Sequence, residues 1–208
     1  YSREEISKMS GVASGKSLTM ILRALEASDF IEYYKPFENS RRQMMYRLVD
    51  PFCLFYLDQV EGRHRGENFW RDNEHHASLS TWRGRAFENA CLRHTGQIKT
   101  AMGVGGVSSE DSPWTLQGQE GQKGMQIDLI ICRSDRVVNL CEMKFVNTEF
   151  EVKKDYEETL RRRINWMTEH VSSRHNVQMT LVTTYGLKYG LHSGIFQRVV
   201  TLESLFAY

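Results

Sequence analysis

Two carboxylates and a lysine stand out because they interrupt two otherwise apolar segments, residues 127–131 and residues 140–144. Asp128 lies near the start of the first segment, and Glu142 and Lys144 lie two residues apart in the second. Side chains alternate between the faces of a strand, so Glu142 and Lys144 should point the same way, and a hairpin should bring Asp128 beside them. Buried carboxylates are costly unless they are paired or bind something, and their oxygens suit Mg²⁺ or Mn²⁺. A neighbouring lysine can position or deprotonate a water molecule and balance charge on a phosphate.

This pattern resembles the PD-(D/E)xK nuclease superfamily, with thirteen residues between Asp128 and the sequence Glu142-Met143-Lys144. The superfamily often adds an acid on the helix before the hairpin, and Glu88 fits that position. Ile127 stands where the motif name has proline, which is a mild departure. The resemblance implies that Asp128 and Glu142, with Glu88, hold Mg²⁺ and that Lys144 positions the attacking water. The alternative is a structural ion-pair cluster in a domain that has lost catalysis.

The segments around these residues predict an α/β (α+β) domain over residues 81–208 with a mixed central sheet. A helix should run from Ser80 or Thr81 to about His94, with Phe87, Ala90, Cys91 and His94 on its packed face and Gly96 closing it. Residues 103–124 are rich in Gly, Ser and Gln and predict a hairpin or loop. Further elements are predicted as strands at 126–132, 137–145, 177–183 and 196–201, a helix at 153–171 and a final helical turn at 202–206.

Residues 1–50 have the order of a winged helix-turn-helix. Ser2 should begin one helix and Ser14 a second, and a hairpin should follow over residues 30–49. The usual first helix of such a domain is missing, so we expect that the chain is truncated at its N-terminus. The exposed face of the second helix is a candidate for DNA contact; an equal alternative is that this face is only solvated and the winged helix packs against a neighbouring domain. The hairpin tip could contact phosphate, although a basic turn is more often only solvated. These candidates are Lys16, Ser17, Thr19, Arg23, Arg41 and Arg42.

Residues 51–80 are predicted to form a helical connector. Asp50 at the N-cap and Pro51 at the first helical position are a strong helix start. A second, short helix is expected around Phe69 and Trp70.

A second resemblance is carried by residues 46–52, 84–88, 127–129, 142–144 and 201–206. Through these segments the whole chain is similar to the C-terminal half of a prokaryotic AAA+-type P-loop ATPase family, in which an ATPase module precedes a winged helix and a nuclease-like domain. This resemblance implies an ATPase module before Tyr1 and ATP binding only through that module. The run from Gly11 to Ser17 is not a P-loop, because three residues rather than four separate its glycines.

The bulk composition sets limits on function. The net charge of +1 does not itself indicate a nucleic-acid binder, so DNA contact would depend on local patches. No apolar run reaches the length of a membrane span, and the four cysteines form no CxxC pair, which favours a cytoplasmic protein with reduced thiols. We therefore expect a DNA-binding, Mg²⁺-dependent nuclease-like module. The alternatives are an inactive nuclease fold that binds DNA or protein, and a winged-helix transcription regulator.

Overall fold

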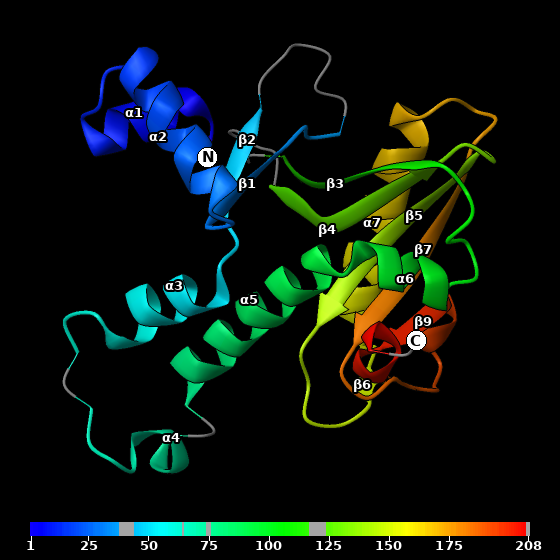
Figure 1. Cartoon of the computed structure of the whole chain (residues 1–208). Coiled ribbons are helices and arrows are strands. Elements are labelled where there is room, and N and C mark those ends of the chain that lie inside the picture. Colours follow the sequence, from blue (N-terminus) through cyan, green and yellow to red (C-terminus); the bar gives the residue numbers. More distant parts are fainter. Residues whose placement is uncertain (38–43, 64, 74–75, 117–123, 207–208) are drawn as a thin grey trace. The chain divides into compact units, whose positions relative to one another are not determined.

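A computed structural model describes residues 1–37, 44–63, 65–73, 76–116 and 124–206 (Figure 1). The chain forms two compact units, an N-terminal unit over Tyr1–Ala86 and a C-terminal unit over Phe87–Tyr208. Each unit has its own set of helices and strands and is described by itself. None of the helices in the described residues combines the length and apolar character needed to cross a membrane.

The N-terminal unit begins with two helices, α1 (Arg3–Ser10) and α2 (Lys16–Ala27). Ser2 caps α1 through a reciprocal capping box with Glu5, as its sequence predicts. The prediction that Ser14 caps α2 is wrong: the N-cap is Gly15, and the Ser14 hydroxyl instead accepts a hydrogen bond from Arg3 Nε at 3.2 Å.

The predicted hairpin and connector follow in the same unit. Strand β1 (Ile31–Tyr34) pairs antiparallel with β2 (Met45–Leu48). Asp50 then caps α3, accepting a hydrogen bond from the Cys53 amide at 2.6 Å, with Pro51 at the first helical position. The remaining elements are α3 (Pro51–Phe55), the π-helix η1 (Tyr56–Val60), α4 (Phe69–Asp72) and the first half of α5 (Ala77–Arg93).

The C-terminal unit is built on a five-stranded mixed sheet with the order β3-β4-β5-β7-β9. The first three strands are antiparallel neighbours, whereas β5, β7 and β9 run parallel. Two further strands, β6 and β8, have two residues each and pair with one another in parallel. They are too short to show an alternation of apolar and polar residues, so the sequence did not predict them. The strands are β3 (Ser109–Leu116), β4 (Met125–Arg133), β5 (Val137–Lys144), β6 (Phe150–Glu151), β7 (Asn176–Thr183), β8 (Leu187–Lys188) and β9 (Phe196–Thr201).

Helices cover both faces of this sheet, with α6 (Thr95–Ala101) in front and α7 (Lys154–His170) behind in Figure 1. The front face carries an apolar core in which Phe87 and Cys91 pack with Cys141 and Met143 of β5. Two short 3₁₀ helices, η2 (Ser193–Ile195) and η3 (Leu202–Leu205), complete the unit. The sheet and its two helical layers are the frame that positions the candidate site.

Three local predictions for the α5 region are wrong. The helix begins at Ala77, so Ser80 and Thr81 lie inside it rather than at its start. Gly96 does not close the helix, because α5 ends at Arg93 and His94 becomes the N-cap of α6, in which Gly96 is an ordinary helical residue. Ala90 is exposed rather than packed. Periodicity alone could not show this break, since α6 continues the helical pattern after a single non-helical residue.

Candidate functional site

Asp128 and Glu142 come together where β4 and β5 run side by side. Leu129 pairs with Cys141, so the next positions along the two antiparallel strands are Asp128 and Glu142. The exposed fraction of Asp128 is 7% and that of Glu142 is 1%. Asp128 Oδ2 accepts a hydrogen bond from the Met143 amide at 2.8 Å. The carboxylate therefore binds the backbone of β5 just beyond the last paired residues of the two strands. The predicted meeting of the two acids is therefore present in the fold.

Glu142 holds three donors at once. Lys144 Nζ lies 2.6 Å from Glu142 Oε1, the Tyr156 hydroxyl donates to the same oxygen, and Arg163 pairs with Oε2. Tyr156 and Arg163 are seven residues apart on α7, which places them on one face of that helix. A carboxylate that is almost fully buried thus has two cations and a hydroxyl as partners, which offsets the cost of its burial.

The remaining predicted acid, Glu88, is half-buried on α5. Its charge helps to raise the pKa of Asp128, so it acts electrostatically on the pair. Within the described part of the chain, no three His, Cys, Asp or Glu side chains are grouped closely enough to hold a metal ion. Asp128, Glu142 and Lys144 are thus brought together, with Glu88 near Asp128 but not in a preformed ligand set.

Burial and like charge dominate the protonation of this cluster. Burial, then repulsion from Glu142 and Glu88, raises the pKa of Asp128 from its usual 3.8 to about 7. Burial lowers the pKa of Lys144, but Glu142 and Tyr156 raise it by more, so its pKa is above the usual value. Lys144 is consequently a stable ammonium near neutral pH. It can position water and balance negative charge, but it is not a free amine that could deprotonate water.

Asp128 should make the stability of the protein fall as pH rises. Its pKa is higher in the folded chain than in the unfolded one, so the folded state binds an extra proton between about pH 4 and pH 7 and loses that advantage as pH increases through this window. We expect wild type to lose about 4 kcal/mol relative to Asp128→Asn across the window, since one pKa unit corresponds to about 1.4 kcal/mol. Urea unfolding at several pH values measures this.

Asp135→Asn is the control for that comparison. Arg133 lowers the pKa of Asp135 through a hydrogen bond from Nε at 3.0 Å, so this acid cannot cause a loss of stability with rising pH. If stability still falls with rising pH in Asp128→Asn, or no longer falls in Asp135→Asn, Asp128 is not the cause of the pH dependence.

Sequence reasoning missed Tyr156 and Arg163 as members of the site. Both lie in the helix predicted at 153–171, where Tyr156 falls on the apolar side and Arg163 is one of three consecutive arginines. In the structure Arg161 pairs with Glu157, Arg162 is exposed, and the Arg163 side chain is only 14% exposed. The seven-residue spacing between Tyr156 and Arg163 shows that they share one side of the helix, but it does not show that this side faces Glu142.

The candidate DNA-contacting residues belong to the N-terminal unit. Lys16, Ser17 and Arg23 are exposed on α2. Thr19 is half-buried, and its hydroxyl accepts a hydrogen bond from Arg3 Nη2 at 2.8 Å. Arg41 and Arg42 lie outside the described residues.

Comparisons with known proteins add little to this geometry. No protein-family model matches the chain. No curated protein matches it. Among solved structures, the chain is similar to the crystal structure of a protein of unknown function, AF1548, with 15% sequence identity and a TM-score of 0.37. The alignment covers 55% of this chain and 64% of that chain, so it spans less than two thirds of that protein.

Proposed function

We propose that residues 81–208 are a PD-(D/E)xK nuclease-like domain that cleaves phosphodiester bonds of DNA with Mg²⁺ or Mn²⁺. The observation that carries the proposal is the burial of Asp128 and Glu142 side by side on adjacent strands, with the Lys144 ammonium paired to Glu142. Such a cluster is costly, and perturbed acids of this kind gather at functional sites. The resemblance of these residues and of Glu88 to the nuclease motif supports the same conclusion.

The donor chemistry of the cluster fits a hard divalent cation. Carboxylate oxygens are the ligands that Mg²⁺ prefers, and a bound cation would offset the burial and then the like-charge repulsion that raise the pKa of Asp128. The nearby thiol of Cys91 does not compete, because burial raises its pKa to about 12 and keeps it protonated. Glu142 would have to release one of its present donors, Arg163 or Lys144, to become a ligand.

Each residue then has a distinct task. Asp128 and Glu142, with Glu88 nearby, would hold the cation, which when bound would polarise the scissile phosphate. The Lys144 ammonium would position the attacking water and balance charge on the phosphate. Tyr156 donates to Glu142 and so orients its carboxylate.

Calorimetric titration with Mn²⁺ tests the proposal. We expect wild type to bind Mn²⁺ and the variant Asp128→Asn/Glu142→Gln to lose that binding, because both carboxylates are replaced by neutral amides of similar shape. The matched control is Asp155→Asn/Glu158→Gln, which removes two exposed acids of α7 and should leave the titration unchanged. Equal binding by all three proteins would contradict the assigned site, and a DNA cleavage screen would follow a positive result.

A specific observation favours a second candidate, a catalytically inactive nuclease fold that binds DNA or protein. The three donors on Glu142 already satisfy that carboxylate as an ion-pair cluster. This candidate predicts no Mn²⁺ binding by wild type or by the double variant, together with intact folding.

The N-terminal unit is proposed to be a winged helix-turn-helix that binds DNA. Two helices followed by a hairpin, and the exposed Lys16, Ser17 and Arg23, support this. The resemblance to an AAA+-type ATPase family supports a further proposal, that an ATPase module of the full protein works with these units. A transcription regulator driven by the winged helix is the third candidate, and it predicts sequence-specific duplex binding that survives Asp128→Ala.

A further inference from the structure

A row of polar side chains crosses the front face of the sheet, which elsewhere carries the apolar core. Asn139 of β5 pairs with Ile131 of β4 on one side and with Gln178 of β7 on the other. Alternation from Ile131 places Arg133 on the same face. Four neighbouring strands contribute to the row, which consists of Arg133, Asn139, Gln178 and Arg198.

A bulge in β9 determines where Arg198 points. Met179 pairs with Phe196, but the next residue, Thr180, pairs with Arg198, so Gln197 is the extra residue. The Gln197 side chain accepts a hydrogen bond from the Met179 amide at 2.7 Å, so this backbone N–H of β7 keeps a partner at the bulge. The shift aligns Arg198 with the face of Thr180 and Val200, and bulges of this kind often redirect a side chain into a site.

These four side chains line one cavity of about 190 Å³. Met102 and Gly103, which follow α6, line it as well. A volume of roughly 10–15 Å³ holds one water molecule, so the cavity has room for a group much larger than water. It lies on the α6 face, whereas Glu142 contacts α7 on the opposite face of the sheet.

Two arginines and two side-chain amides give this cavity a lining rich in hydrogen-bond donors. Arg133 is held by Asp135, and its Nη1 donates to Asn139 Oδ1 at 3.3 Å, while Asn139 Nδ2 donates to Thr180 at 3.3 Å. The guanidinium of Arg198 and the amide of Gln178 make no hydrogen bond or ion pair within the described residues. Since Asp135 neutralises Arg133, the exposed guanidinium of Arg198 and the amide of Gln178 leave one positive charge and several N–H donors at the cavity that no acceptor of the described residues satisfies.

We propose that this cavity binds a phosphate group. Arg198 would supply the charge and a fork of N–H donors, Gln178 a neutral N–H donor, and Arg133 a second guanidinium held in place by Asp135 and Asn139. A phosphate group has at least two charged oxygens, each of which can accept more than one hydrogen bond, so all three side chains can donate to it together. The group is either free phosphate or a phosphate of a nucleic-acid backbone. The site does not depend on the nuclease proposal, because it shares none of its residues.

An NMR titration of the full chain with inorganic phosphate at constant ionic strength tests this. We expect the amide signals of Gly103 and Val104, which line the cavity, to shift with millimolar affinity. Arg198→Gln should weaken binding at least tenfold, because a charge-assisted hydrogen bond is lost. Gln178→Glu should abolish binding, because it places a negative charge in the cavity.

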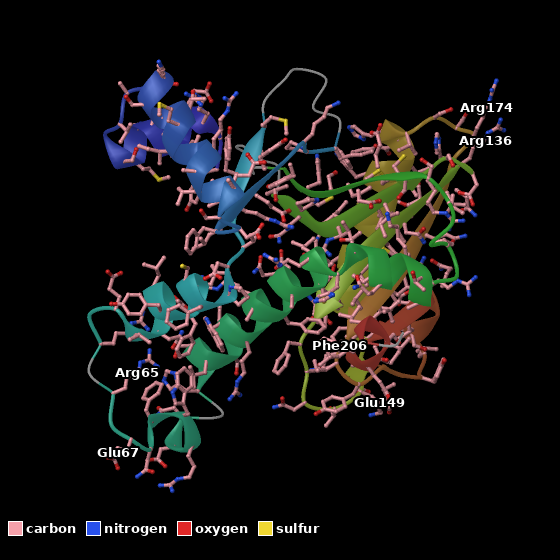
Figure 2. All side chains as sticks on the ribbon, viewed as in Figure 1. Arg65, Glu67, Arg136, Glu149, Arg174 and Phe206 are labelled. Atoms are coloured by element: carbon pink, nitrogen blue, oxygen red, sulfur yellow. The ribbon has the colours of Figure 1, made fainter. Side chains whose placement is uncertain are left out.

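The control variant is Arg136→Gln. Arg136 is exposed and projects outward from the same end of the sheet, as does Arg174 (Figure 2), and it does not line the cavity. Its replacement should change the affinity less than twofold. No shift in wild type, or equal losses in Arg198→Gln and Arg136→Gln, would overturn the proposal.

A second arm separates the two sources of phosphate. Loss of the bound inorganic phosphate when a short DNA duplex is added would assign the cavity to backbone phosphate. Unchanged phosphate binding in the presence of the duplex would assign it to a small free phosphate. Both results require the cavity to bind phosphate. If the duplex binds wild type and Gln178→Glu with equal affinity, the cavity does not bind the phosphates of the nucleic-acid backbone.

Discussion

Replacement of Arg163 by methionine is expected to destabilise the protein by about 3 kcal/mol, near the lower end of the range for breaking a buried ion pair. Arg163 is the partner of Glu142 Oε2, and Glu142 is only 1% exposed. Without the guanidinium, that oxygen has no charged partner on α7 and remains out of reach of water. Lys144 and Tyr156 still hold the other oxygen, which is why the cost is not larger. Urea unfolding at neutral pH measures the effect.

Arg162→Met is the matched control, because it makes the same change one residue away. Arg162 is exposed and donates to the Thr159 hydroxyl at 3.2 Å. Its loss should change the free energy of unfolding by no more than about 0.5 kcal/mol. If the two variants lose the same stability, the cluster on Glu142 does not stabilise the fold. Glu142→Gln in the Arg163→Met background should recover part of the loss, because it removes the unpaired charge.

The sequence was sufficient to predict four of the five strands of the main sheet and the meeting of the two acids. The fifth strand, β3 (Ser109–Leu116), lies in a segment that was predicted as a hairpin or loop. The apolar segments that hold Asp128 and Glu142 fall in β4 (Met125–Arg133) and β5 (Val137–Lys144), and the short turn between them allows only a hairpin. Once the two strands are antiparallel neighbours, the position of Asp128 beside Glu142 follows from counting residues. The finer identities, a winged helix and a nuclease fold, stay proposals.

Contacts between distant elements could not be predicted in the same way. Whether Arg163 points to solvent or to Glu142 depends on how α7 is rotated over the sheet, and three consecutive arginines on a helix look alike in sequence. The polar row at the cavity could not be predicted from the sequence either. Its members come from four strands, and Arg198 joins them only because Gln197 is a bulge residue. Register and bulges arise from tertiary packing, so local patterns do not show them.

The second large effect concerns chemistry rather than stability. If the domain cleaves DNA as proposed, Lys144→Met should lower the rate of single-turnover cleavage at least a hundredfold, which is the lower end for loss of a positioned catalytic group. The control is Lys154→Met, because Lys154 is exposed at the start of α7 and should be replaceable without a change in rate. Circular dichroism and urea unfolding establish that both variants are folded.

The metal affinity of Lys144→Met separates a catalytic role from a structural one. The Lys144 ammonium lies 2.6 Å from Glu142 Oε1, so it competes with any cation for that oxygen. Removing it should leave Mn²⁺ binding unchanged or make it tighter, even as cleavage is lost. A lysine that merely supports the cluster would give the opposite result, because disorder of Glu142 would weaken metal binding and cleavage together. Since the raised pKa of Lys144 keeps it protonated, the wild-type rate should also show no rise from deprotonation of this lysine between pH 7 and about pH 10, the usual lysine range.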